Sequence, residues 1–134
     1  MVDYKGIEKV DVQALIAQRA LTEALWLTLQ KQGMKEESCQ RVECLFVIQE
    51  ASAVASLLNA FPETAGWNHI VSEVDDPPGA MSAKIISPPT YLSRGALLEL
   101  VDVMMIAAHE SGSTFDGFNL DLADLQRRSW WRRW

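Results

Sequence analysis

The chain has 134 residues, of which 49% are hydrophobic and 22% are charged, with seven glycines and five prolines. This composition is typical of one globular domain and excludes a disordered, collagen-like or low-complexity protein. The net charge is −6, and two cysteines, Cys39 and Cys44, are too few for a disulfide framework.

Charge is distributed unevenly along the chain. The last eight residues, 127–134, contain four arginines, three tryptophans and no acidic residue. The preceding 126 residues contain eight basic and eighteen acidic residues, a net charge of −10. An acidic body repels a phosphate backbone, so we expect no direct binding of nucleic acid. We expect a single domain over residues 11–126, followed by a basic, Trp-rich tail over residues 127–134.

The sequence contains no pattern typical of secretion or membrane insertion. The N-terminus lacks a basic segment followed by an apolar core and a small-residue cleavage site, so it does not resemble a signal peptide. No apolar run approaches the ~20 residues needed to span a bilayer. We therefore expect a cytoplasmic protein without a membrane span.

A helix and a strand are predicted first. Over residues 11–32, apolar residues recur three or four positions apart without an internal glycine or proline, which predicts an amphipathic helix, and Gly33 follows as a left-handed cap. A strand is predicted over residues 41–49. Its segment 44–48 is apolar on both faces of the pleat, so we expect both faces to be covered.

A second helix and a hairpin follow. Ser52 is a candidate N-cap for a helix of about three turns that ends at Pro62. Two extended segments, residues 67–74 and 80–87, are separated by the proline- and glycine-containing residues 75–79, which predicts a hairpin with a loop.

The last predicted helix covers residues 96–111, where apolar residues have helical spacing and Gly112 ends the pattern. A strand is expected over residues 114–119. Residues 120–126 fit either a further short helix or an ordered arm.

The order of elements predicts an α+β fold. Without the first helix, the order is βαββαβ, the arrangement of a ferredoxin-like sandwich, in which two helices cover one face of a four-stranded antiparallel sheet. The additional N-terminal helix then either covers the second face or pairs with another chain. Because strand residues alternate, we expect Cys44, Phe46 and Ile48 to face the two helices and Leu45 and Val47 to face the additional helix or a second subunit.

The sequence contains no recognisable catalytic set, and we expect no enzyme activity. His69 in a strand and His109 near a helix end are more typical of structural or solvent-facing histidines. Asp75 and Asp76 lie in a turn, where short acidic side chains bond to nearby backbone. Cys44 lies within an apolar strand, which indicates core packing rather than a reactive thiol.

We expect no cofactor and no metal. The glycines are solitary, so neither a P-loop nor a dinucleotide fingerprint is present, and no His or Cys spacing fits a tetrahedral metal site. The Met104–Met105 pair belongs to an apolar helix stripe and indicates core packing.

The tail is the candidate partner-binding segment, because Trp and Arg are preferred at interfaces. Arginine also pairs with anionic lipid or stacks on bases, so a protein, a membrane surface and a nucleic acid remain open as partners. Folding back onto the acidic body, packing in a dimer and fraying are the alternatives. The candidate residues are Arg127, Arg128, Trp130, Trp131, Arg132, Arg133 and Trp134.

The order of elements, together with several short sequence motifs between Leu15 and Phe118, resembles the family of regulators of ribonuclease E activity B (RraB-like proteins) of bacteria. The family motifs are Gly33, the strand Val42–Ile48, the pair Pro89 and Thr90 before the last helix, and a closing strand with Phe115, Asp116, Gly117 and Phe118. Phe115 and Phe118 stand where the family has Tyr- and Trp-like residues. The long acidic tail of some members is replaced here by a basic one.

The resemblance implies a non-catalytic protein that binds the scaffold region of ribonuclease E and lowers its cleavage of RNA. The resemblance gives the family motifs a structural role, and it implies no catalytic residue in this chain. The acidic body also fits a second class, a bacterial immunity or antitoxin-like protein that occludes a toxin. A homodimer is compatible with both.

Overall fold

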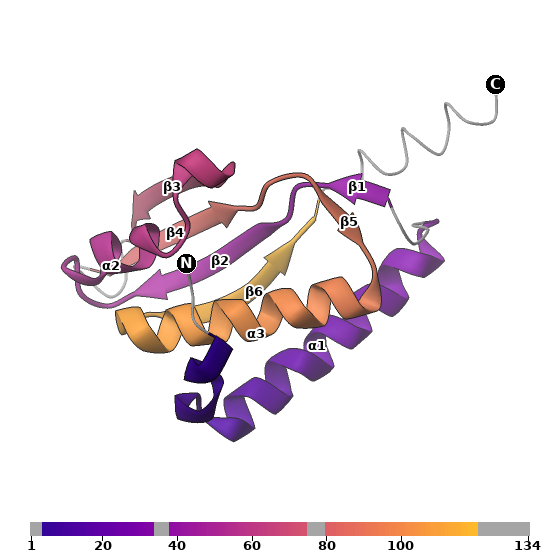
Figure 1. Cartoon of the computed structure of the whole chain (residues 1–134), viewed down its shortest axis with the longest axis horizontal. Coiled ribbons are helices and arrows are strands. Elements are labelled where there is room, and N and C mark those ends of the chain that lie inside the picture. Colours follow the sequence, from indigo (N-terminus) through magenta and orange to yellow (C-terminus); the bar gives the residue numbers. More distant parts are fainter. Residues whose placement is uncertain (1–3, 34–37, 75–79, 121–134) are drawn as a thin grey trace.

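The structure is a computed structural model, and it describes residues 4–33, 38–74 and 80–120. Figure 1 shows the arrangement of the elements. In chain order they are η1 (Tyr4–Lys9), α1 (Val12–Lys31), β1 (Ser38–Gln40), β2 (Glu43–Ile48), α2 (Ala53–Asn59), η2 (Glu63–Ala65), β3 (Asn68–Glu73), β4 (Met81–Ile86), β5 (Thr90–Leu92), α3 (Arg94–Ser111) and β6 (Thr114–Asn119), where η denotes a 3₁₀ helix.

The protein is α+β, with a four-stranded antiparallel sheet in the order β3-β4-β2-β6. The predicted hairpin is confirmed, because β3 and β4 pair antiparallel on either side of residues 75–79. The predicted strand over residues 114–119 is confirmed with the same bounds. A two-stranded sheet formed by β1 and β5 was not predicted.

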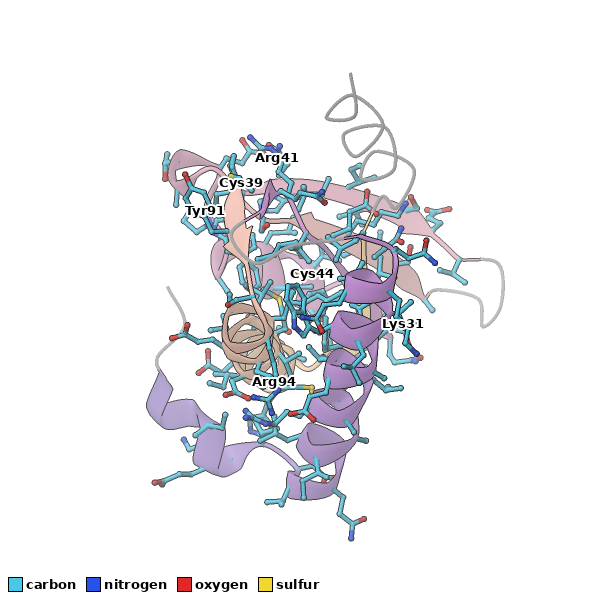
Figure 2. All side chains as sticks on the ribbon, turned by 90° about the vertical axis from the view of Figure 1, so that its right-hand side faces the viewer. Lys31, Cys39, Arg41, Cys44, Tyr91 and Arg94 are labelled. Atoms are coloured by element: carbon cyan, nitrogen blue, oxygen red, sulfur yellow. The ribbon has the colours of Figure 1, made fainter. Side chains whose placement is uncertain are left out.

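The core lies between the sheet and helices α2 and α3. Cys44, Phe46 and Ile48 are buried as predicted, and α3 contributes nine buried residues, including Met104 and Met105. The Phe46 ring of β2 packs against the Phe115 ring of β6, with centroids 5.4 Å apart, so the two neighbouring strands share an aromatic contact. Figure 2 shows Cys44 between the sheet and the helices.

Helix α1 does not cover the second face of the sheet, and this part of the prediction was wrong. It packs against α3 and the edge strand β6, on the same side of the sheet as α3 (Figure 1). The Gln18 side-chain amide donates to the Phe115 carbonyl oxygen at 3.4 Å. Leu45 and Val47 on the second face are half-buried, and neither belongs to the main core.

A physical reason for the position of α1 lies in the neighbouring strand. On the second face, β4 places Ser82 opposite Val47 and Lys84 opposite Leu45. These polar side chains interrupt the apolar surface. Helix α1 instead packs on α3 and β6, and its Trp26 and Leu29 are buried in the main core.

Two helix boundaries differ from the prediction. Helix α2 has seven residues, about two turns rather than three, because the Ala60 and Phe61 amides donate to the Leu57 and Leu58 carbonyl oxygens, which tightens the chain before Pro62. Ser52 is at its N-cap position but makes no side-chain capping hydrogen bond. Helix α3 begins at Arg94 rather than at residue 96, where the Ser93 hydroxyl accepts from the Ala96 amide at 3.0 Å.

Asp116 and Gly117 form an irregularity in β6. The pairing of β2 with β6 shifts between Leu45 and Phe46, which leaves Asp116 without a register partner, and Gly117 has a φ of +116°. Gly117 pairs with Leu45 beside this irregularity. A Cβ on Gly117 would meet no atom within 4 Å, so the backbone conformation, rather than close packing, favours glycine.

Candidate functional site

Helix α1 carries most of the exposed large hydrophobic side chains in the described part of the chain. Six large hydrophobic side chains in the described residues are more than half exposed, and four of them lie on α1, with 59–65% of their surface accessible. They are Val12, Ile16, Leu21 and Leu27. Val12, Ile16, Ala20 and Leu27 fall within about 80° of one another on a helix of 3.6 residues per turn, a sector that also contains Glu23 and Gln30. We call these four residues the α1 stripe.

The face of α1 that borders the stripe is anchored, so the α1 stripe has a fixed orientation. Trp26 and Leu29 are buried against the core, and Arg19 forms an ion pair with Asp102 of α3 at 2.7 Å. Arg94, at the start of α3, forms a second ion pair with Glu23. An amphipathic helix on a domain surface normally presents polar residues to solvent, so an apolar outward stripe indicates an interaction surface.

A pocket of about 490 Å³ lies between α2, η2 and α3. Its lining is Ala60, Phe61, Pro62, Ala65, Trp67, Thr90, Ala96, Glu99, Leu100 and Val103. The Phe61 and Trp67 rings have centroids 4.7 Å apart at an interplanar angle of 53°, so they form an aromatic wall. This size and apolar character fall within the range of small-ligand and side-chain binding pockets.

Hydrogen bonds hold the aromatic wall in place. His69 Nε2 lies 2.6 Å from the Phe61 carbonyl oxygen, which ties the end of α2 to β3. The Thr90 hydroxyl donates to the Pro88 carbonyl oxygen at 2.8 Å. Glu99 is the one charged side chain among the ten described lining residues, and it is exposed. The pocket therefore combines an apolar interior with one acidic position.

A second pocket, of about 410 Å³, lies between α1 and the C-terminal half of α3, and its lining includes Asp11 and His109. Asp11 has a structural role there, because its carboxylate accepts from the Gln13 amide at 2.9 Å as the N-cap of α1. His109 is exposed.

The cysteines and acidic residues in the described ranges do not assemble a reactive or metal-binding group. Burial, together with the neighbouring Glu43 carboxylate, raises the pKa of the Cys44 thiol, which keeps it protonated. Residues 4–33, 38–74 and 80–120 contain no cluster of three or more His, Cys, Asp or Glu side chains that could hold a metal ion. No helix in these ranges is long and apolar enough to cross a membrane.

The last two family motifs, Pro89–Thr90 and Phe115–Phe118, lie in separate parts of the fold. Pro89 is exposed and Thr90 begins β5, whose Thr90–Leu92 segment pairs with β1; Cys39 and Tyr91 of this pair lie side by side in Figure 2. Phe115 is buried and Phe118 is half-buried in β6, with ring centroids 5.1 Å apart. Thr90 therefore lines the apolar pocket, whereas Phe115 and Phe118 contribute to packing.

The tail residues, Arg127, Arg128, Trp130, Trp131, Arg132, Arg133 and Trp134, lie outside the described residues, as do Asp75 and Asp76. Sequence reasoning did not identify the α1 stripe or the apolar pocket. The stripe has a sequence signal, because residues 12–31 contain more apolar positions than one buried face requires. The pocket joins residues about 30 positions apart and has no local signal.

No protein-family model matches this chain, and the search of curated proteins found no match.

Proposed function

We propose that this chain is a non-catalytic protein-binding regulator, and that its partner is a ribonuclease E-type RNA-processing enzyme whose activity it lowers. The α1 stripe is the observation that carries the protein-binding part of the proposal. The enzyme's identity comes from the resemblance to RraB-like proteins. A cytoplasmic location follows from the same proposal.

The order of elements supports a ferredoxin-like fold as part of this proposal. The strands β2, β3, β4 and β6 follow one another with α2 and α3 between them in a βαββαβ order, and they lie in the sheet as β3-β4-β2-β6. In this arrangement each helix connects two strands that are separated in the sheet by a third.

The charge distribution supports a partner with a basic contact region. Residues 1–126 have a net charge of −10, which attracts a basic protein over a distance and raises the rate of association. Helix α1 itself contains only Arg19, Glu23 and Lys31 as charged residues, so a partner loses little charge hydration when it covers the α1 stripe. Residues 1–126 can therefore attract a basic partner over a distance while the α1 stripe makes the apolar contact with the same partner.

Direct titration against the purified scaffold region of ribonuclease E tests the proposal. We expect saturable binding by the full chain. Ile16→Glu with Leu27→Glu places two charges in the α1 stripe and should weaken binding at least about tenfold. The matched control, Ser56→Glu with Asn59→Glu, adds the same two charges to exposed positions of α2 and should bind like the unaltered chain.

Absence of binding to the scaffold region would contradict the ribonuclease E assignment. Tight binding to a bacterial toxin encoded beside this chain's gene would favour the immunity or antitoxin-like alternative instead. Sedimentation of the unaltered chain, the stripe variant and the α2 control variant tests for self-association. A dimer that only the stripe variant loses would mean that a second copy of the chain binds the α1 stripe.

A further inference from the structure

We propose that the apolar pocket between α2 and α3 is the docking site for the C-terminal segment of the same chain, residues 127–134. In this arrangement one tryptophan ring of the segment enters the pocket, and a neighbouring arginine pairs with Glu99. The proposal concerns a different surface from the α1 stripe and does not depend on the identity of an external partner.

The pocket has the chemistry that an indole ring requires. Phe61 is buried and Trp67 is half-buried, and their tilted rings provide an aromatic wall against which a third ring can pack at an offset or edge-on. Leu100, Val103 and Ala96 of α3 form the opposite side. A pocket of about 490 Å³ has room for a bicyclic side chain.

The charges of the pocket and of the segment are complementary. Glu99 is the charged member of the lining, and its exposed carboxylate lies beside the apolar interior. Residues 127–134 contain four arginines, three tryptophans and no acidic residue. An arginine that flanks a docked tryptophan can therefore form a two-pronged hydrogen bond with this carboxylate, which a lysine would form less well.

The sheet places Leu120, which precedes the segment in the chain, at one end of a row of residues whose other end adjoins the pocket. Asn119, Glu43, Ile86 and Asn68 lie in one row across β6, β2, β4 and β3. Three strand spacings separate the ends of this row, about 14 Å. Trp67 of the pocket directly precedes Asn68, and Leu120 directly follows Asn119.

The connecting chain is long enough for this route. Trp130 is ten positions after Leu120, and an extended chain of that length spans about 33 Å. This exceeds the distance across the row by a margin that allows a path around the end of the sheet. Because both ends belong to one chain, the local concentration of the segment at the pocket is high, and a modest affinity is sufficient for docking.

The test labels the tryptophans of the full chain with 5-fluorotryptophan and measures how a soluble gadolinium chelate broadens each fluorine resonance. Single Trp→Phe variants assign the five resonances. In the unaltered chain we expect one of Trp130, Trp131 and Trp134 to be as protected as Trp67. Glu99→Arg reverses the charge at the exposed rim and should increase the broadening of that resonance at least threefold.

Two further variants separate docking from a general change in the fold. Ala65→Glu places a carboxylate at an exposed position of the lining on η2, and it should also release the protected tryptophan. Glu110→Arg makes the same charge reversal at an exposed position near the other end of α3, and it should leave the protection unchanged.

Three outcomes would overturn the proposal. In the first, all three segment tryptophans are broadened as strongly as in a free peptide of residues 127–134. In the second, one is protected, but neither Glu99→Arg nor Ala65→Glu releases it, so it lies elsewhere. In the third, the protection is lost on dilution, which means that the segment docks on a second copy rather than on its own chain.

Discussion

Arg19 of α1 and Asp102 of α3 form an ion pair in which one guanidinium nitrogen, Nη1, donates to both carboxylate oxygens, at 2.7 and 2.8 Å. The Asp102 side chain is 11% exposed, whereas the Arg19 side chain is 42% exposed. The acid therefore depends on its partner more than the base does. This pair joins the helix that carries the α1 stripe to the main core.

We expect Arg19→Met to lower the free energy of unfolding by roughly 1–3 kcal/mol, because it leaves a largely buried carboxylate without this partner; the figure is below that of a fully buried pair since Arg19 is partly hydrated. Urea unfolding measures the change. The double variant Arg19→Met with Asp102→Leu should recover part of the loss. A double variant whose loss equals the sum of the two single losses would show that the pair contributes no coupling energy.

Gly117 provides a second stability test. Its φ of +116° is strained for any residue with a Cβ, so we expect Gly117→Ala to destabilise the fold by about 1–2 kcal/mol. Gly95 is the matched control, because it lies in the first turn of α3 at an exposed position with space for a Cβ. Gly95→Ala should be neutral or stabilising by up to about 1 kcal/mol. Equal effects of the two substitutions in thermal unfolding would contradict this account.

The Cys44 thiol is expected to be unreactive in the folded chain. Burial raises its pKa above the value of about 8.5 that a thiol has in an unfolded chain. The unfolded state therefore releases a proton above that pH while the folded state retains it, so this contribution to stability is present below about pH 8.5 and is lost as the pH rises. In a Cys39→Ser variant at pH 8, iodoacetamide should modify Cys44 at least about 100-fold more slowly than in urea. Equal rates with and without urea would show that Cys44 is accessible.

Long, locally consistent elements were predictable from the sequence. Helices α1 and α3 have a helical apolar period and glycines at their C-terminal ends, and Gly33 has the positive φ, 98°, expected of a left-handed cap. The burial of Cys44, Phe46 and Ile48 followed from strand alternation in the same way.

Features that depend on contacts between distant segments were not predictable. β1 and β5 have three residues each and pair only with one another, so neither has a local pattern that distinguishes it from a loop. The polar residues Ser82 and Lys84, which lie beside Val47 and Leu45 on the second face of the sheet, belong to β4, about 60 residues later in the chain than α1. The apolar pocket requires α2, β3 and α3 to be placed together.

We predict that the full chain alone has no appreciable affinity for RNA at physiological salt, because only residues 127–134 concentrate positive charge, beside a body of net charge −10. Fluorescence anisotropy with a labelled single-stranded RNA measures this. A variant in which Arg127, Arg128, Arg132 and Arg133 are all replaced by Gln is the control. Binding with a steep salt dependence that this variant abolishes would identify residues 127–134 as a nucleic-acid arm.

The rate at which intact ribonuclease E cleaves a fluorescent RNA, measured with increasing amounts of this chain, tests the proposed regulation most directly. We predict a saturable decrease in the cleavage rate that the Ser56→Glu, Asn59→Glu control retains and that Ile16→Glu with Leu27→Glu greatly reduces. A cleavage rate that does not change with saturating chain, or a decrease that the stripe variant reproduces fully, would contradict the proposal that this chain regulates the enzyme through the α1 stripe.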